Sequence, residues 1–206
     1  MNSYIQHLTV KEVRSSEVVV SESSIPGAGN GLFAKKDIQA GTIIPYYTIL
    51  KIIESPDFDK ILDTYFMTVA YKNSKGRYRT IGKIIADGNP ELPRIKRLKT
   101  AYTVSAFANE SPTKPPNCIF VNNPAISKEY VHECLAKRTP MVSTLLVVPY
   151  DVKRGTELCT LYGSDYARSY KVWRDRDGKK DEIIGLSHDI VEFHTDTICG
   201  LFQKKK

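Results

Sequence analysis

The stretch "GAGNGLFA", Gly27 to Ala34, holds three glycines and one asparagine within five residues. Residues of this kind tolerate positive φ, so the chain either turns sharply here or lets its backbone approach a ligand closely. A dinucleotide-binding fingerprint needs G-x-G-x-x-G, but Leu32 stands where the last glycine belongs. No Lys follows in the pattern of a phosphate-binding P-loop. Taken by itself, the stretch predicts an Asn-Gly turn between two strands.

Segments on both sides of this stretch have the composition of β-strands, being rich in β-branched and aromatic residues and bounded by Gly, Ser and Pro. There is no internal repeat and no succession of parallel βαβ units, so the sequence predicts a mainly β (α+β) fold with short strands. The expected elements are strands in 16–23, 40–53, 75–91, 143–152 and 156–163, a short helix and a strand in 55–71, and a strand or short helix, a Pro-rich loop and a strand in 101–123.

The pattern changes after Gly163. Tyr166, Tyr170 and Trp173 recur at helical spacing within 164–180, which predicts a closing helix with one aromatic face.

Length and composition limit the class of protein. With 206 residues, the chain is long enough for one domain of about 150 residues with extensions. Its hydrophobic share of 41% and charged share of 26% fit a folded soluble protein. The longest apolar runs are too short to cross a bilayer, and the N-terminus lacks the apolar stretch of a signal peptide. We therefore expect an intracellular protein, nuclear or cytoplasmic, without a membrane partner.

The four cysteines are widely spaced and form no C-x-x-C pair, so structural zinc is not expected. His188 and His194 lie near Cys199, but this trio lacks a second tight pair of ligands. We expect no metal site, and we expect the cysteines to be reduced thiols.

Positive charge is concentrated in one part of the chain. From Lys72 to Lys99 there are nine Lys or Arg residues against two acidic ones, while the rest of the chain balances at 21 against 21. Such a patch attracts nucleic acid or an acidic partner. A solvated pair of strands with its loop accounts for the same composition, so both interpretations stay open here.

Five motifs follow one another along the chain: a Gly-Asn-Gly turn, "AGTIIPYY", "IIADGN", "FANESPTKPPN" and "GTELCTLYG". Their order resembles that of the SET-domain protein lysine methyltransferases. The residues that carry the resemblance are Gly29, Gly31, Leu32 and Phe33, then Asn109, Ser111, Pro116 and Asn117, then Glu157, Leu158, Tyr162 and Gly163. The resemblance divides the chain into an N-terminal extension (1–16), a SET-like catalytic domain (17–175) with a basic insert around 51–100, and a C-terminal extension (176–206).

The resemblance implies a SET-domain fold of small curved sheets, in which a C-terminal segment threads past the "FANES" loop like a pseudoknot. It also implies S-adenosylmethionine as the methyl donor. The residues that it assigns to this cofactor are Gly29, Asn30, Gly31, Leu32, Asn109, Glu110, Tyr162 and Tyr166. Tyr162 aligns with the catalytic tyrosine of the family, and Tyr46, Tyr47 and Phe107 become candidates for the wall of the substrate-lysine channel. The aromatic face of 164–180 either closes over the adenine or the channel, or packs in the core.

The implied reaction needs a neutral lysine amine, because only the neutral form has a lone pair to attack the methyl group. Neutralising an ordinary lysine at pH 7 costs about 4 to 5 kcal/mol. An apolar channel next to a positive sulfonium lowers the pKa of the lysine by desolvation and repulsion, so a dedicated base is not required. The implied partner is a protein with a target lysine, with a histone as one candidate, and nucleic acid is a candidate partner of 72–99.

The sequence departs from the family pattern at four places. Glu110 replaces a His, Ala106 and Leu161 stand where Arg and Asp are common, and the spacing from Asn109 to Asn117 is two residues longer than usual. These departures and the basic patch motivate an alternative hypothesis, a catalytically silent SET-like module that binds a peptide or nucleic acid.

Overall fold

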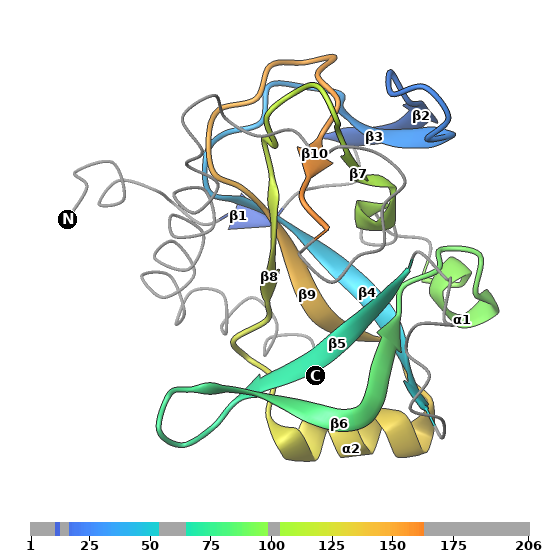
Figure 1. Ribbon diagram of the computed structural model, residues 1–206, viewed down its shortest axis with the longest axis vertical. Helices are drawn as coiled ribbons and strands as arrows, with labels where there is room; N and C mark the ends of the chain where they lie inside the picture. Colours follow the sequence, from blue (N-terminus) through green and yellow to red (C-terminus); the bar gives the residue numbers. More distant parts are fainter. Residues whose placement is uncertain (1–10, 13–16, 54–64, 99–103, 163–206) are drawn as a thin grey trace.

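The computed structural model describes residues 11–12, 17–53, 65–98 and 104–162. Strands provide most of the regular structure in these residues, which confirms the predicted mainly β fold (Figure 1). The predicted helix over 164–180, with Tyr166, Tyr170 and Trp173, and the predicted short helix before β5 lie outside the described residues. The elements are β1 (Lys11–Glu12), β2 (Val18–Glu22), β3 (Asn30–Ala34), β4 (Thr42–Ile52), β5 (Phe66–Lys72), β6 (Tyr78–Asp87), α1 (Pro93–Lys96), the 3-10 helix η4 (Ser105–Phe107), β7 (Asn109–Glu110), β8 (Ile119–Asn122), α2 (Lys128–Lys137), β9 (Met141–Val148) and β10 (Cys159–Thr160).

The largest sheet has the strand order β5-β6-β4-β9-β8, and β1 pairs in parallel with β4. Strand β4 connects its two halves, since its first part pairs with β9 and its last part, from Ile49, pairs with β6. The register of β4 against β9 shifts between Tyr46 and Tyr47, which leaves Ser143 as an extra residue in β9. Thr48 donates a buried hydrogen bond of 3.0 Å to the Ser143 hydroxyl. Such a bulge bends and twists a strand pair, and here it lies where the sheet turns from one half to the other.

Among the described residues, two apolar clusters mark an upper and a lower region (Figure 1). The upper region comprises β2, β3, η4, β7, β10 and the adjoining parts of β4, β8 and β9, and its core includes Leu32, Ile44 and Leu158. The lower region comprises β5, β6, α2 and the last part of β4, and its core includes Leu50 and Val131. The upper region carries the residues on which the family resemblance rests.

The glycine-rich stretch forms the turn and second strand of the β2–β3 hairpin. The positive φ values are at Gly27 (77°) and Gly29 (71°), and the N–H of Ser23 donates to the carbonyl of Gly29 at 2.8 Å. Asn30 and Gly31 already belong to β3, opposite residues of β2. The predicted Asn-Gly turn is therefore wrong in its position, because the glycines that precede Asn30 supply the left-handed conformations.

The segment 156–162 passes between β7 and Asn117, two parts of the chain that are close to each other in the sequence. On one edge, the N–H of Leu158 donates to the carbonyl of Leu32 at 2.7 Å, and β10 pairs in parallel with β7. On the other edge, the N–H of Asn117 donates to the carbonyl of Cys159 at 3.0 Å. Because β7 and Asn117 are the two ends of one Pro-rich loop, the segment is threaded between those ends, as the resemblance implies.

Helix α2 is absent from the predicted elements. Ser127 caps its N-terminus by accepting a hydrogen bond from the N–H of Tyr130 at 3.1 Å, and Arg138 ends it with a left-handed φ of 51°. Its buried residues, Val131 and Cys134, pack into the lower core. No helix among the described residues combines the length and apolar character needed to cross a membrane.

Candidate active site

A cavity of about 610 Å³ opens where the upper region meets the beginning of β5, and it lies between that end of β5, the β2–β3 turn, η4 and β7. Six of the predicted site residues line it: Asn30, Tyr46, Phe107, Asn109, Glu110 and Tyr162. They come from segments that are far apart in the sequence, and the pairing of β10 with β7 brings the last three together. The other lining residues are Ile25, Pro26, Gly27, Ala28, Tyr65, Phe66, Met67, Ala106, Ala108, Pro112 and Phe120.

Tyr46 forms part of the aromatic wall of this cavity. Its side chain is 3% exposed, and its ring meets the Phe120 ring edge-on, with centroids 5.4 Å apart. A Cβ at Gly88 would lie 2.0 Å from the Tyr46 ring and 2.4 Å from its hydroxyl. The tyrosine therefore has this position only because residue 88 lacks a side chain.

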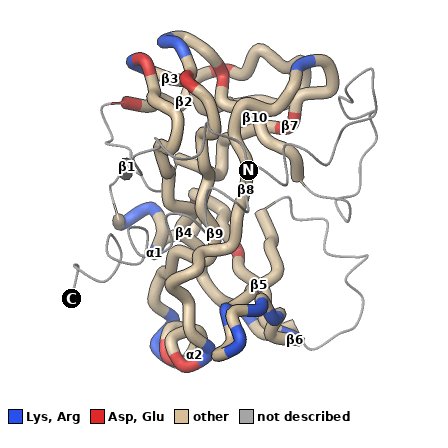
Figure 2. Tube along the Cα trace, turned by 90° about the vertical axis from the view of Figure 1, so that its left-hand side faces the viewer, with Lys and Arg blue, Asp and Glu red and all other residues tan. Residues whose placement is uncertain are grey.

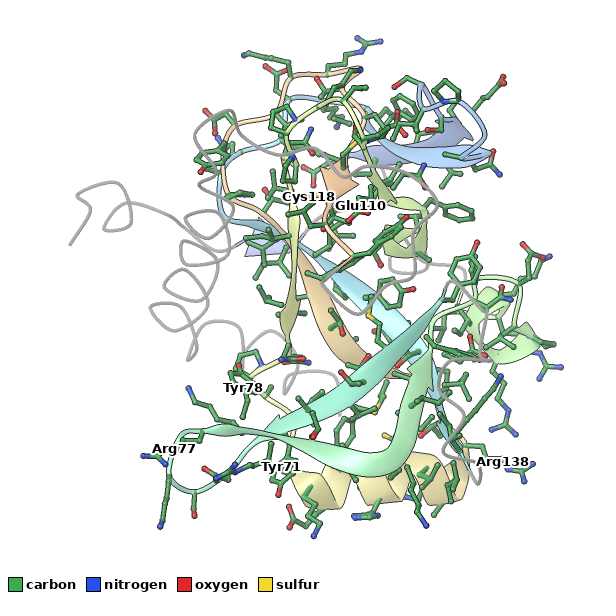
Figure 3. The ribbon with its side chains drawn as sticks, in the orientation of Figure 1. Tyr71, Arg77, Tyr78, Glu110, Cys118 and Arg138 are labelled. Carbon is green, nitrogen blue, oxygen red and sulfur yellow. The ribbon has the colours of Figure 1, made fainter. Side chains whose placement is uncertain are left out.

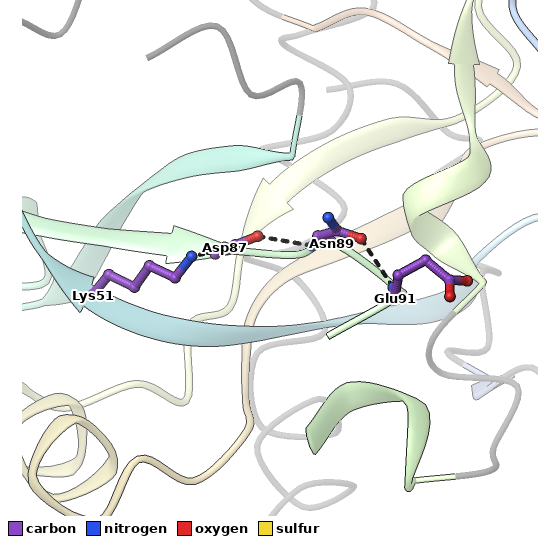
Figure 4. A network of polar contacts seen from close by, with 4 residues as sticks. All are labelled: Lys51, Asp87, Asn89 and Glu91. Atoms are coloured by element: carbon purple, nitrogen blue, oxygen red, sulfur yellow. Dashed lines mark hydrogen bonds and ion pairs between the residues drawn. The ribbon is translucent and has the colours of Figure 1, made fainter. Parts of the chain in front are cut away.

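A polar network holds the chain around Gly88 in place (Figure 4). The Asp87 carboxylate is almost fully buried, pairs with Lys51 and accepts from the N–H of Asn89 at 3.0 Å. The Asn89 side chain in turn accepts from the N–H of Glu91 at 2.9 Å. These contacts fix both sides of the glycine against which Tyr46 packs.

The polar end of the cavity is built around Tyr162. Its N–H donates to the Glu110 carboxylate at 2.8 Å, and its hydroxyl lies 3.5 Å from the Asn109 side-chain oxygen. The Asn109 amide group donates to the carbonyl of Asn30 at 2.9 Å. Glu110 is 4% exposed, and Figure 3 shows it between β7 and β10. Its side chain, where the resemblance expects a His, thus positions the backbone of Tyr162.

Glu157 is the hub that connects the β2–β3 turn to β7. One carboxylate oxygen accepts from the Ser23 hydroxyl (2.6 Å) and from the Asn109 amide (3.3 Å). The other accepts from the N–H (2.9 Å) and the hydroxyl (2.5 Å) of Ser24. Burial by itself raises the pKa of this carboxyl, but the hydrogen bonds outweigh burial and hold its pKa below the ordinary value. The two serines are functional-site neighbours that the sequence analysis did not identify.

Gly31 is required by this hub. A Cβ on residue 31 would lie 2.3 Å from the Glu157 carboxylate oxygen. The glycine of the motif therefore makes room for a buried carboxylate within the protein.

Several predicted site residues lie away from the cavity. Leu32 is fully buried in the upper core, and Gly29 lines a neighbouring hollow together with Asn30. Tyr47 is not among the cavity residues, because adjacent residues of a strand point to opposite faces. Burial, then Cys134 and then Tyr47, raise the pKa of Tyr130 on α2 to about 12. Tyr166 lies outside the described residues.

Three cysteines in the described part of the chain are buried free thiols. Cys118 donates to the carbonyl of Cys159 at 3.1 Å, and it lies beside β10 (Figure 3). Burial, followed by the neighbouring Cys159, raises the pKa of the Cys118 thiol. Burial, followed by Glu157, raises the pKa of Cys159 to about 11. Cys118 and Cys159 are therefore neutral thiols at pH 7. The residues that the structure describes contain no cluster of three His, Cys, Asp or Glu side chains that could hold a metal ion.

The described lining residues of the cavity include one carboxylate and no Lys or Arg. A site of this composition does not favour phosphate groups, which need positive charge or clustered N–H donors. It favours a cation, because aromatic faces and a carboxylate both attract positive charge.

The sequence matches no protein-family model, and no curated protein matches it significantly. Among solved structures, the chain is similar to the methyltransferase domain of human PR domain-containing protein 2, with 13% identity, coverage of 81% of this chain and 86% of that chain, and a TM-score of 0.43. It is also similar to ATXR5 in complex with histone H3.1 mono-methylated on R26, with 14% identity, coverage of 76% of this chain and 60% of that chain, and a TM-score of 0.42.

Proposed function

We propose that this protein is an S-adenosylmethionine-dependent methyltransferase that acts on the ε-amine of a protein lysine, with a histone as the first substrate to test. The observation that carries the proposal is the cavity, in which Asn30, Asn109, Glu110 and Tyr162 face an aromatic wall. The order of motifs in the sequence supports the same function independently.

The cavity fits the methyl donor in size and in chemistry. Ligand pockets commonly measure about 300–1,000 Å³, a range that includes this one. Gly27, which lines the cavity, has open space where a Cβ would lie, so the hairpin backbone is bare on that side. Asn30, Asn109, Glu110 and Tyr162 would hold the donor. When bound, S-adenosylmethionine supplies an electrophilic methyl group on a positively charged sulfur.

The aromatic wall would receive the lysine. Ring faces such as those of Tyr46, Phe107 and Phe120 attract the ammonium form and exclude water. Desolvation then lowers the pKa of the amine, which favours loss of its proton. The Tyr162 hydroxyl orients the neutral amine, while Glu110 fixes the tyrosine backbone. Alignment of this kind contributes several kcal/mol to lowering a barrier, so no separate base is needed.

The test combines binding and transfer. Purified wild-type protein is titrated calorimetrically with S-adenosylhomocysteine and then incubated with core histones, a lysate and donor labelled in the methyl group. We expect saturable binding and labelled lysine. Tyr162→Phe keeps the N–H that bonds Glu110 but removes the hydroxyl, and turnover should fall by about 100-fold or more. Tyr150→Phe is the matched control, because Tyr150 is 48% exposed and does not line the cavity.

Absence of both cofactor binding and label in the wild-type protein would contradict the proposal. Binding without transfer on any substrate would instead favour the silent module. Equal activity of Tyr162→Phe and Tyr150→Phe would remove Tyr162 from its assigned role.

A further inference from the structure

The β5–β6 hairpin leaves the large sheet and continues as a two-stranded ribbon. Only the last residues of β6, from Ile84, pair with β4, whereas Tyr78, Arg79 and Thr80 pair with β5 alone. The hairpin closes through Asn73 and Gly76, with Gly76 at a φ of 73°. Figure 1 shows this end projecting beyond the rest of the lower region.

Besides the half-buried Lys72, four cations lie on this hairpin: Lys75, Arg77, Arg79 and Lys83. All four are exposed, and none forms an ion pair with another residue in the described part of the chain. By contrast, Lys51 pairs with Asp87 of β6, and Lys96 of α1 pairs with Glu91. Lys and Arg positions gather at this end of the molecule (Figure 2). We call the four residues the basic ribbon.

The two tyrosine rings of the hairpin make contacts within the protein. Tyr71 packs against the lower core, and the Lys72 ammonium lies 5.9 Å from the centroid of the Tyr78 ring. Figure 3 shows both tyrosines near Arg77. Unpaired bases bind by stacking on free aromatic faces. The ribbon therefore offers contacts to phosphates and not stacking platforms, which favours a duplex over a single strand.

We propose that the basic ribbon binds double-stranded DNA. A two-stranded ribbon fits the major groove of B-form DNA, which is about 12 Å wide, while the corresponding groove of an RNA duplex is too narrow. Duplex DNA also presents about one negative charge per 1.7 Å of its axis, a density that suits a row of exposed cations. This proposal does not rest on the proposed enzymatic function.

The ribbon and the cavity lie at opposite ends of β5. Phe66 and Met67 line the cavity, while Lys72 leads into the ribbon. Seven residues of strand span about 23 Å. DNA on the ribbon would therefore leave the cavity open.

The experiment measures fluorescence polarisation of a labelled 30-base-pair duplex of arbitrary sequence, mixed with the full chain at 50, 100 and 200 mM salt. The test variant replaces Lys75, Arg77 and Arg79 by Gln. Lys83 is left unchanged because its backbone has a positive φ of 64°. A substitution there could change the backbone as well as the charge. The matched control replaces three exposed cations of the upper region by Gln: Lys35, Lys36 and Arg154. Circular dichroism and a urea titration check that both variants fold like the wild type.

We expect the wild type and the control to bind the duplex with a micromolar Kd at low salt. Removing three phosphate contacts should make the slope of log K against log salt less negative by about 2.7. From 50 to 200 mM salt, the wild type should then lose about 40-fold more affinity than the test variant. Equal slopes for the two triple variants would overturn the proposal. Tighter binding to polyglutamate than to the duplex would also overturn the proposal, in favour of an acidic peptide. Tighter binding to the corresponding single strand than to the duplex would overturn it in favour of single-stranded nucleic acid.

Discussion

The upper and lower regions depend on polar contacts to different extents. In the upper region, buried polar side chains connect segments far apart in the sequence. Asn117 donates its amide to the carbonyl of Glu157 at 2.8 Å and accepts from the N–H of Cys159 at 2.8 Å. In the lower region, apolar residues such as Val69, Val131 and Met141 form the core between the hairpin and α2.

This difference explains why the residues that carry the family resemblance lie in the upper region. A polar network needs a donor or an acceptor at each position, so it restricts residue identity. An apolar core needs residues of suitable volume, and many combinations satisfy it. The stability of the upper region should therefore fall when a substitution removes or adds a single polar or bulky group. The stability of the lower region should change little when a substitution preserves side-chain volume.

Among changes in the upper region, the largest effect is expected for Glu157→Ala. This change leaves the Ser24 N–H without its acceptor and the Asn109 amide with only the Asn30 carbonyl, and it should lower the free energy of unfolding by about 3 kcal/mol. Urea unfolding at pH 7 measures it. A loss below about 0.5 kcal/mol would contradict the role of Glu157 as the hub.

Acidification provides a control for this variant. The native pKa of Glu157 is below the ordinary value of 4.5, so the unfolded state takes up the proton first. The contribution is fully present above the ordinary pKa and is lost as the pH falls through the lowered native pKa. Wild-type protein should therefore lose more stability than the Ala variant when the pH falls below 4.5.

Gly31→Ala should have the next largest effect. The new methyl group would meet the Glu157 carboxylate and should lower stability by about 2 kcal/mol. In the Glu157→Ala background the same change should cost far less, because the clashing oxygen is absent. Additive costs in this double-mutant cycle would show that a side chain at position 31 is disfavoured for another reason than the Glu157 carboxylate.

The smallest effect is expected for a change in the lower region that preserves side-chain volume. Met141→Leu preserves volume in a fully buried position and should cost less than about 1.5 kcal/mol. Met141→Ala, which leaves a cavity, should cost about 2 to 5 kcal/mol. If the Leu variant lost as much stability as the Ala variant, the lower core would depend on residue identity as strongly as the upper network.

Much of the fold is predictable because strand composition is a local property. Alternation and β-branched residues located β2, β4, β6 and β9. Helix α2 was missed although Val131, Cys134 and Leu135 have helical spacing and Ser127 is a suitable cap. Its short length and charged surface gave a weak signal between two clear strands.

Only part of the candidate site was predictable: six of the predicted residues line the cavity, and their arrangement was not predicted. Tyr46 and Tyr47 are equivalent in composition, but the pleat of β4 and the space beside Gly88 place only Tyr46 on the cavity. Nothing local indicates that Ser23 and Ser24 bind Glu157, since more than a hundred residues separate them along the chain.

The sequence alone determined the mainly β class, the order of the motifs and the position of the excess positive charge, because each depends on composition or on spacing along the chain. Only the tertiary structure decided what the glycine-rich stretch does. Gly27 and Gly29 turn the hairpin, and Gly31 makes room for the Glu157 carboxylate that arrives from the far end of the described chain. The physical reason is that a contact between residues far apart in the sequence depends on how the chain folds. The pairing of β10 with β7 brings the Glu157 carboxylate next to Gly31, and the sequence around Gly31 does not indicate this.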